Sequence, residues 1–93
     1  MSDVERYTNP QIVRKNVDKH LGKDVPLYYS THMDKKYMIK DPHGKWVHFG
    51  QYGYTDFSRH QNIKRRELFR KRNAKWAMSP KWSAAWLSYH LLW

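Results

Sequence analysis

A four-residue turn between two β-type runs restricts the fold of this chain more than any other feature. The runs KYMIK and KWVHFG flank the sequence DPHG at residues 41–44. Proline suits the second position of a type I turn, and glycine can adopt the left-handed conformation that follows it. The sequence therefore predicts a bulged β-hairpin.

The predicted turn also sets the register of the hairpin. Pairing of Asp41 with Lys45 makes these the cross-strand partners: Lys40 and Trp46, Ile39 and Val47, Met38 and His48, and Tyr37 and Phe49. One face then carries Tyr37, Ile39, Val47 and Phe49, which predicts a hydrophobic core face. The other face carries Met38, Lys40, Trp46 and His48 and is amphipathic.

The N-terminal third is expected to supply one helix and one short strand. Residues 1–8 are expected to be frayed. Asn9 and the proline after it are typical of a helix N-terminus, so we expect a helix over residues 10–21 that stops at Gly22. The sequence LYYS at residues 27–30 is a candidate third strand.

Two further helices are expected after the hairpin. Thr55 or Ser58 can cap a helix that continues through residues 62–77, and the Ser-Pro pair at 79–80 predicts the start of a last helix over residues 80–93. The expected fold is a small single α+β domain. It has a β-hairpin, or a three-stranded sheet, packed with an N-terminal helix and two C-terminal helices.

Charge divides the chain unevenly. Its 93 residues carry a formal net charge of +10, and residues 35–93 hold thirteen of the eighteen Lys and Arg but only three of the eight Asp and Glu. We therefore expect a charge-balanced helical extension at 1–34 and a basic α+β core at 35–93. A polyanionic partner is the physical expectation for such a domain.

The absence of cysteine excludes disulfides and thiol catalysis, and we expect no transmembrane segment.

The sequence KRRELFRKR concentrates this charge on one predicted helix. Its cations surround the helix on every side, with Glu67 as the only acid among them, whereas a solvated helix normally carries many glutamates. We expect these residues to contact nucleic-acid phosphates, with two hairpin lysines as further contacts and Lys35 and Lys36 able to extend the surface. The candidate contacts are Lys64, Arg65, Arg66, Arg70, Lys71, Arg72, Lys75, Lys40 and Lys45.

Two aromatic patterns each allow two interpretations. Arg65, Phe69, Arg72 and Trp76 share one helical face, where the rings either stack on bases or dock on the core; docking is favoured, because a small domain needs its rings inside. Trp82, Trp86, Tyr89 and Trp93 form a second stripe. That stripe is most simply core packing, with an oligomer or assembly interface as the alternative.

The histidines do not predict a catalytic or metal site. His43, His48 and His60 lie near one another and near Asp56 in the sequence, but their spacing is not that of zinc ligands. No triad order, phosphate-binding glycine loop or carboxylate pair is visible. We therefore expect no enzymatic activity, no metal and no cofactor.

Four blocks in order resemble a known family: KKYMIK, GKWVHFG, GYTDFSRHQNIKRRELFRKRNAKW and WSAAWLSYHLLW. They are similar to small proteins of unassigned function that are encoded mainly by nucleocytoplasmic large DNA viruses. The resemblance covers about residues 35–93 and departs from the family pattern at Asn73, where many relatives have histidine. It implies a viral origin and a setting in the virion or the cytoplasmic viral factory, and it supplies no catalytic residues.

These observations predict a non-enzymatic viral protein that grips nucleic-acid phosphates with little sequence specificity, DNA being favoured over RNA. Its role would be genome packaging or a function in the viral factory. The alternative is a minor structural protein of the virion. There the aromatic C-terminal helix would be an interface for assembly or homo-oligomers, and the basic helix would meet acidic protein surfaces or headgroups.

Overall fold

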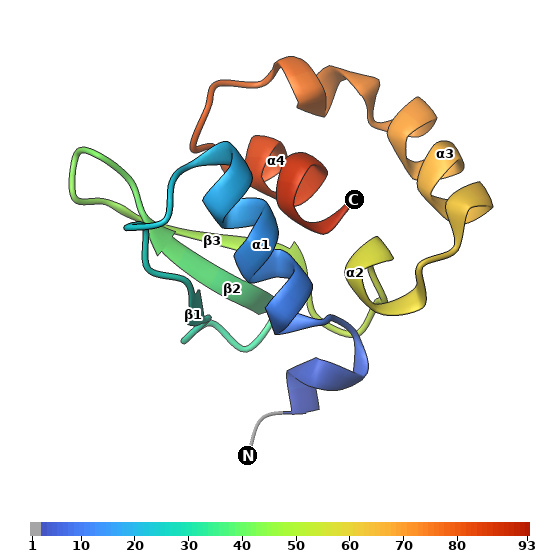
Figure 1. Cartoon of the computed structure of the whole chain (residues 1–93), viewed down its shortest axis with the longest axis horizontal. Coiled ribbons are helices and arrows are strands. Elements are labelled where there is room, and N and C mark those ends of the chain that lie inside the picture. The colour runs from blue at the N-terminus through green and yellow to red at the C-terminus, as the bar shows by residue number, and fades with distance from the viewer. Residues whose placement is uncertain (1–2) are drawn as a thin grey trace.

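A three-stranded antiparallel sheet lies at the centre of the structure, a computed structural model that describes residues 3–93. Its strands are β1 (Tyr28–Tyr29), β2 (Lys35–Lys40) and β3 (Trp46–Gln51), in that spatial order. Helices from both ends of the chain accompany the sheet (Figure 1). The expected α+β fold is confirmed, and LYYS supplies the third strand.

The hairpin forms with the predicted register. Lys40 pairs with Trp46, and the pairing continues through to Tyr37 and Phe49. In the turn, the Asp41 amide donates to the Lys45 carbonyl at 2.8 Å, and Gly44 has a φ of +85°. The Asp41 carboxylate also accepts from the amide of Lys45 at 2.9 Å. Local turn chemistry is therefore sufficient to explain this element.

The N-terminal helix α1 (Pro10–His20) also forms as expected, because the Asn9 side chain accepts a hydrogen bond from the Gln11 amide. The expected fraying of residues 1–8 is wrong for residues 3–8, and residues 1–2 lie outside the described part of the chain. A short helix, η1 (Asp3–Arg6), precedes α1, and the side chains of Val4 and Thr8 are buried. Burial of these two side chains ties the segment down.

The single helix expected from Thr55 or Ser58 onward is wrong. The chain instead forms α2 (Phe57–His60), α3 (Ile63–Arg72) and the turn η2 (Ala74–Met78). Gln61 has a left-handed φ of +54°, and the Asn62 side chain then starts a new helix by accepting from the Arg65 amide at 3.0 Å. This asparagine cap after a left-handed residue is the physical reason for the break.

The last helix begins later than expected. It comprises α4 (Ala84–Leu87) and a π-helical turn, η3 (Ser88–Leu92). The predicted start at residue 80 is wrong, because Ser83 provides the cap by accepting from the Trp86 amide, and Trp82 before it has a φ of +78°. Trp82 therefore does not belong to a helical stripe with the later aromatics.

The core lies between the hairpin's predicted core face and the two helical ends of the chain. Its buried side chains are Val13, Val17, Tyr37, Ile39, Phe49, Leu87, Leu91 and Leu92. Both α1 and the α4–η3 helix thus pack on the face of the sheet that carries Tyr37 and Phe49. The division at residue 34 stays a prediction, although α1 shares this core with residues 35–93. Among the described residues, no helix has the length and apolarity needed to cross a bilayer.

Candidate nucleic-acid interface

The basic helix α3 lies at the edge of the molecule (Figure 1), and none of its side chains is fully buried. Its exposed cations, together with the lysine that follows in η2, are Lys64, Arg65, Lys71, Arg72 and Lys75. Within residues 3–93 the two ion pairs are Arg14 with Asp18 and Lys36 with Asp56. None of the exposed cations is therefore neutralised by a carboxylate of the described chain.

Arg66 and Arg70 differ from the other cations because they point inward. Arg66 Nε and Arg70 Nη2 each donate to the main-chain oxygen of Trp93 at 2.8 Å. The guanidinium of Arg66 also lies 4.6 Å from the ring centre of Phe57, and that of Arg70 lies 5.4 Å from the ring centre of Tyr89. Burial lowers the pKa of Arg70, with the Arg66 charge as the next cause. These two candidate phosphate contacts thus fasten α3 to the C-terminal helix.

The predicted aromatic face of α3 splits into a packed ring and an exposed one. Phe69 stacks on Trp93 with the ring centres 4.2 Å apart and the planes 6° from parallel. Trp76 meets the edge of Phe69 at 5.7 Å and keeps 36% of its surface exposed. The interpretation that both rings dock on the core therefore describes Phe69 better than Trp76.

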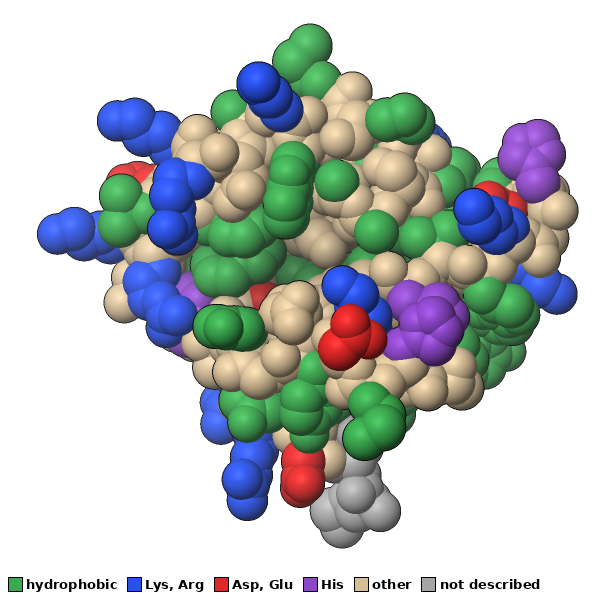
Figure 2. Space-filling model, turned by 180° about the vertical axis from the view of Figure 1, so that it is seen from behind, with side chains coloured by type: hydrophobic (Ala, Val, Ile, Leu, Met, Phe, Trp, Pro, Cys, Tyr) green, Lys and Arg blue, Asp and Glu red, His purple; other side chains and the backbone are tan. Residues whose placement is uncertain are grey.

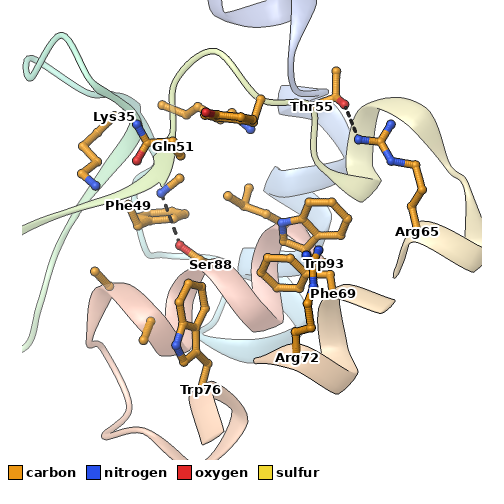
Figure 3. Close-up of a pocket in the computed structure, with 16 residues that line it drawn as sticks. Lys35, Phe49, Gln51, Thr55, Arg65, Phe69, Arg72, Trp76, Ser88 and Trp93 are labelled. Atoms are coloured by element: carbon orange, nitrogen blue, oxygen red, sulfur yellow. Dashed lines mark hydrogen bonds between the residues drawn. The ribbon is translucent and has the colours of Figure 1, made fainter. Parts of the chain in front are cut away.

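A groove separates α3 from the end of the sheet and from α4. This cavity of about 520 Å³ is called the α3 groove here. Its walls come from α3 and η2, from the ends of β2 and β3, and from α4 and η3 (Figure 3). Figure 2 shows Lys and Arg side chains gathered along the edge where α3 lies, beside a hollow with hydrophobic walls. The residues that line it include Lys35, Tyr54, Arg65, Phe69, Arg72 and Trp76.

The hairpin lysines do not form one surface with α3. Lys40 and Lys45 are exposed, but Figure 1 places the hairpin turn on the opposite side of the molecule from α3. Lys40 Nζ lies 5.3 Å from the ring centre of Trp46. The expectation that Lys36 extends the basic surface is wrong, because its side chain is 3% exposed and its Nζ lies 3.0 Å from Asp56 Oδ2.

Asp56 is buried and forms an ion pair with Lys36, a role that the sequence pattern did not reveal. It occupies the N-cap position of α2, but its carboxylate makes no cap bond; it accepts from Lys36 Nζ and from the Ser58 hydroxyl. Burial lowers the pKa of Lys36, and the Asp56 carboxylate opposes that effect. One feature of the sequence could have drawn attention to Asp56: it is one of only three acids in residues 35–93, which carry thirteen Lys and Arg.

Hydroxyl groups extend this buried cluster to the N-terminal segment. Because the Ser58 hydroxyl donates its proton to Asp56, it accepts from the Asn9 amide at 2.9 Å and from Thr8, whose Oγ1 lies at 3.1 Å. Thr8 in turn accepts from the Tyr37 hydroxyl at 2.9 Å. Each hydroxyl has one proton, so this order satisfies every member. We call Lys36, Asp56, Ser58, Thr8 and Tyr37 the Asp56 network.

The histidines occupy separate environments. His43 is exposed in the hairpin turn, whereas His48 stacks on His32 with ring centres 3.5 Å apart. His60 lies against Trp93 at 5.2 Å, and its Nδ1 accepts from the Asn62 amide at 2.9 Å. Over residues 3–93, no three His, Asp or Glu side chains converge in a way that would hold a metal ion.

The aromatics of the candidate partner interface are half-buried against this chain. Trp82, Trp86 and Trp93 pack on the core, and Tyr89 meets Arg70. The buried side chains of the same segment are Leu87, Leu91 and Leu92. The aliphatic flank of the helix therefore enters the core, while the rings cover the margin of the core.

A model of a family of unknown function, DUF5754, matches residues 25–73. The chain belongs to this family. The DUF5754 segment runs through β1, β2, β3, α2 and α3, so it contains the basic helix and four members of the Asp56 network. Trp76 and Trp93, which also line the α3 groove, lie beyond it. No curated protein and no solved structure matches the chain.

Proposed function

We propose that this chain is a non-enzymatic nucleic-acid-binding protein that grips backbone phosphates through α3 and η2. The observation that carries the proposal is a helix that has no fully buried side chain and that exposes Lys64, Arg65, Lys71 and Arg72. None of these cations has a carboxylate partner within residues 3–93. A phosphate backbone supplies the missing negative charge.

Electrostatics explains why such a surface favours a polyanion. Like charges on neighbouring helical turns repel one another, so a basic helix without acid partners is less stable alone than beside an anion. Binding to nucleic acid also releases condensed counterions, which makes affinity strongly dependent on salt. These contacts involve phosphates rather than base edges, and they carry little sequence information.

The viral setting implied by the sequence resemblance belongs to this proposal. In that setting the protein acts on the genome, with DNA favoured over RNA, in the viral factory or the virion. The alternative role as a virion subunit relies on the aromatic stripe at Trp82, Trp86, Tyr89 and Trp93. Those rings are half-buried against the chain itself, so the basic helix is the better-supported site.

The test measures binding to random-sequence DNA as a function of salt by fluorescence anisotropy. Replacing Lys64, Lys71 and Lys75 with glutamine removes three cations from the proposed surface. We expect weaker binding, and the slope of log affinity against log salt should fall by about 2–3 if each lysine contacts one phosphate of a duplex.

A matched control keeps the net charge equal. Lys15, Lys19 and Lys23 are also exposed, and their replacement by glutamine removes the same charge from the region of α1. The proposal requires the α3 variant to lose much more affinity than this control. Equal losses, or wild-type affinity that does not depend on salt, would contradict it.

A further inference from the structure

We propose that the α3 groove accepts unpaired bases, so that the protein binds single-stranded nucleic acid through stacking as well as through phosphate contacts. This inference rests on the proposed function and adds the class of strand that is bound. The observation behind it is a set of rings inside a basic rim. Phe69 and Trp76 lie on the α3–η2 wall (Figure 3), and Tyr54, from the segment between β3 and α2, also lines the groove.

The exposed rings of the groove are suited to stacking against a base. Trp76 keeps 36% of its surface exposed and Tyr54 keeps 69%. Phe69 is held in place by its parallel stack on Trp93, and Trp76 makes an edge-to-face contact with Phe69. A base can stack on such rings whatever its identity, because every base has an aromatic face. The groove's volume of about 520 Å³ lies within the range typical of small-molecule sites, about 300–1,000 Å³.

The charges around the groove fit a nucleic-acid strand. Its lining contains Lys35, Arg65 and Arg72, together with Lys36, whose charge is already neutralised by Asp56. The lining contains no Asp or Glu. Arg65 reaches across to Thr55, to which it donates at 3.2 Å, and Arg72 lies beside the rings. Cations at the rim can hold the phosphates on either side of a base that enters the groove.

A duplex cannot use this groove in the same way. Paired bases are stacked on one another, and a duplex presents base edges rather than base faces to a protein. Stacking on protein aromatics therefore requires bases that are already unpaired. The groove thus adds affinity for single strands, while the exposed cations of α3 serve both forms.

Another exposed tryptophan supplies the matched control. Trp46 on β3 keeps 41% of its surface exposed and contacts Tyr28 on the sheet rather than the α3 groove. The replacements Trp76→Ala and Trp46→Ala therefore remove rings of similar exposure, one inside the groove and one outside it. A third variant, Trp76→Tyr, keeps an aromatic ring in the groove.

The experiment compares three ligands of equal length by anisotropy: a single strand, its duplex, and an abasic strand with the same phosphates but no bases. For Trp76→Ala we expect the single-strand affinity to fall by about 5-fold to 150-fold, the usual contribution of one stacked base. Affinity for the abasic strand and for the duplex should stay unchanged. Trp76→Tyr should restore most of the loss, and Trp46→Ala should bind all three ligands as the wild type does.

Two results would overturn the stacking proposal without touching the proposed function. One is equal wild-type affinity for the single strand and the abasic strand. The other is a Trp76→Ala variant whose affinity is unchanged, or is lowered equally for all three ligands. The glutamine variant of Lys64, Lys71 and Lys75 should lose affinity for every ligand. If no ligand shows salt-dependent binding at all, the proposed function itself fails. Circular dichroism of each variant verifies that it is folded.

Discussion

At the scale of single residues, His60 connects the short helix α2 to the start of the basic helix. Its Nδ1 accepts from the Asn62 amide, which requires an unprotonated nitrogen at that position. Its Nε2 therefore carries the proton of the neutral ring, and it is buried without a partner among the described residues. Protonation would remove the acceptor and place a charge beside Trp93.

This chemistry predicts that stability falls in mild acid. Burial, followed by the Arg65 charge, lowers the pKa of His60 from its ordinary value of 6.5. Between that lowered pKa and 6.5 the unfolded chain binds more protons than the folded chain does, so the free energy of unfolding decreases as the pH falls through this window. Burial also lowers the pKa values of His20 and His48, which adds to the effect.

The variant His60→Asn isolates the contribution of His60. An asparagine oxygen at this position can accept from the amide two residues later, as in an Asx-turn, but it does not titrate. Urea unfolding at about pH 7 and about pH 5, on either side of the ordinary histidine pKa, should show a smaller pH-dependent loss in the variant than in the wild type. An identical loss in both proteins would show that His60 does not titrate in this range.

At the scale of elements, the break at Gln61 and Asn62 decides how the basic helix is presented. A helix continuing from α2 would keep one axis through residue 77, but the left-handed Gln61 turns the chain before α3 begins. The contacts that then hold α3 are few and specific. They include the stack of Phe69 on Trp93 and the hydrogen bonds of Arg66 and Arg70 to the Trp93 oxygen.

Because no side chain of α3 is fully buried, its stability should depend strongly on its cap. Replacing Asn62 with alanine removes the acceptor for the Arg65 amide and should cost about 1 kcal/mol. Hydrogen exchange of the α3 amides should become faster, while the amides of α1 keep their protection. Asn62→Ser retains a cap and should exchange at nearly the wild-type rate. If the alanine variant also exchanges at the wild-type rate, the cap contributes nothing to α3.

At the scale of the whole molecule, the Asp56 network joins three parts of the chain that are distant in the sequence. Thr8 lies 29 residues from Tyr37 and 50 residues from Ser58, yet its hydroxyl bonds to both. Lys36 and Asp56 form a buried ion pair in the same cluster. Breaking one member of such a cluster leaves other buried polar groups without partners, which is costly.

Thr8→Ala tests this network at its N-terminal end. The change leaves the Tyr37 hydroxyl without its acceptor in a buried site, so the free energy of unfolding should fall by about 1–3 kcal/mol. Thr8→Ser keeps the hydroxyl and removes one methyl group, at a cost of about 0.8 kcal/mol. Urea unfolding followed by tryptophan fluorescence measures both variants. Equal losses would mean that packing of the methyl group, rather than the hydroxyl, holds the segment.

The candidate site could be predicted only in part. The basic character of α3 follows from its residues, but the direction of each cation does not. Arg66 and Arg70 point inward because the Trp93 oxygen and the rings of Phe57 and Tyr89 lie on that side. The α3 groove was not foreseen, since its walls come from residues 35–93 in an arrangement that no local pattern encodes.

The sequence by itself determined the hairpin, its register and the first helix, because each depends on neighbours within a few residues. The DPHG turn sets the pairing of Tyr37 with Phe49, and Asn9 starts α1 through a bond to Gln11. Only the tertiary structure decided that Lys36 forms a buried ion pair with Asp56, that Thr8 is buried rather than frayed, and that Trp76 lines a groove. Those outcomes depend on side chains brought together from distant segments, where desolvation and hydrogen bonding override local preference.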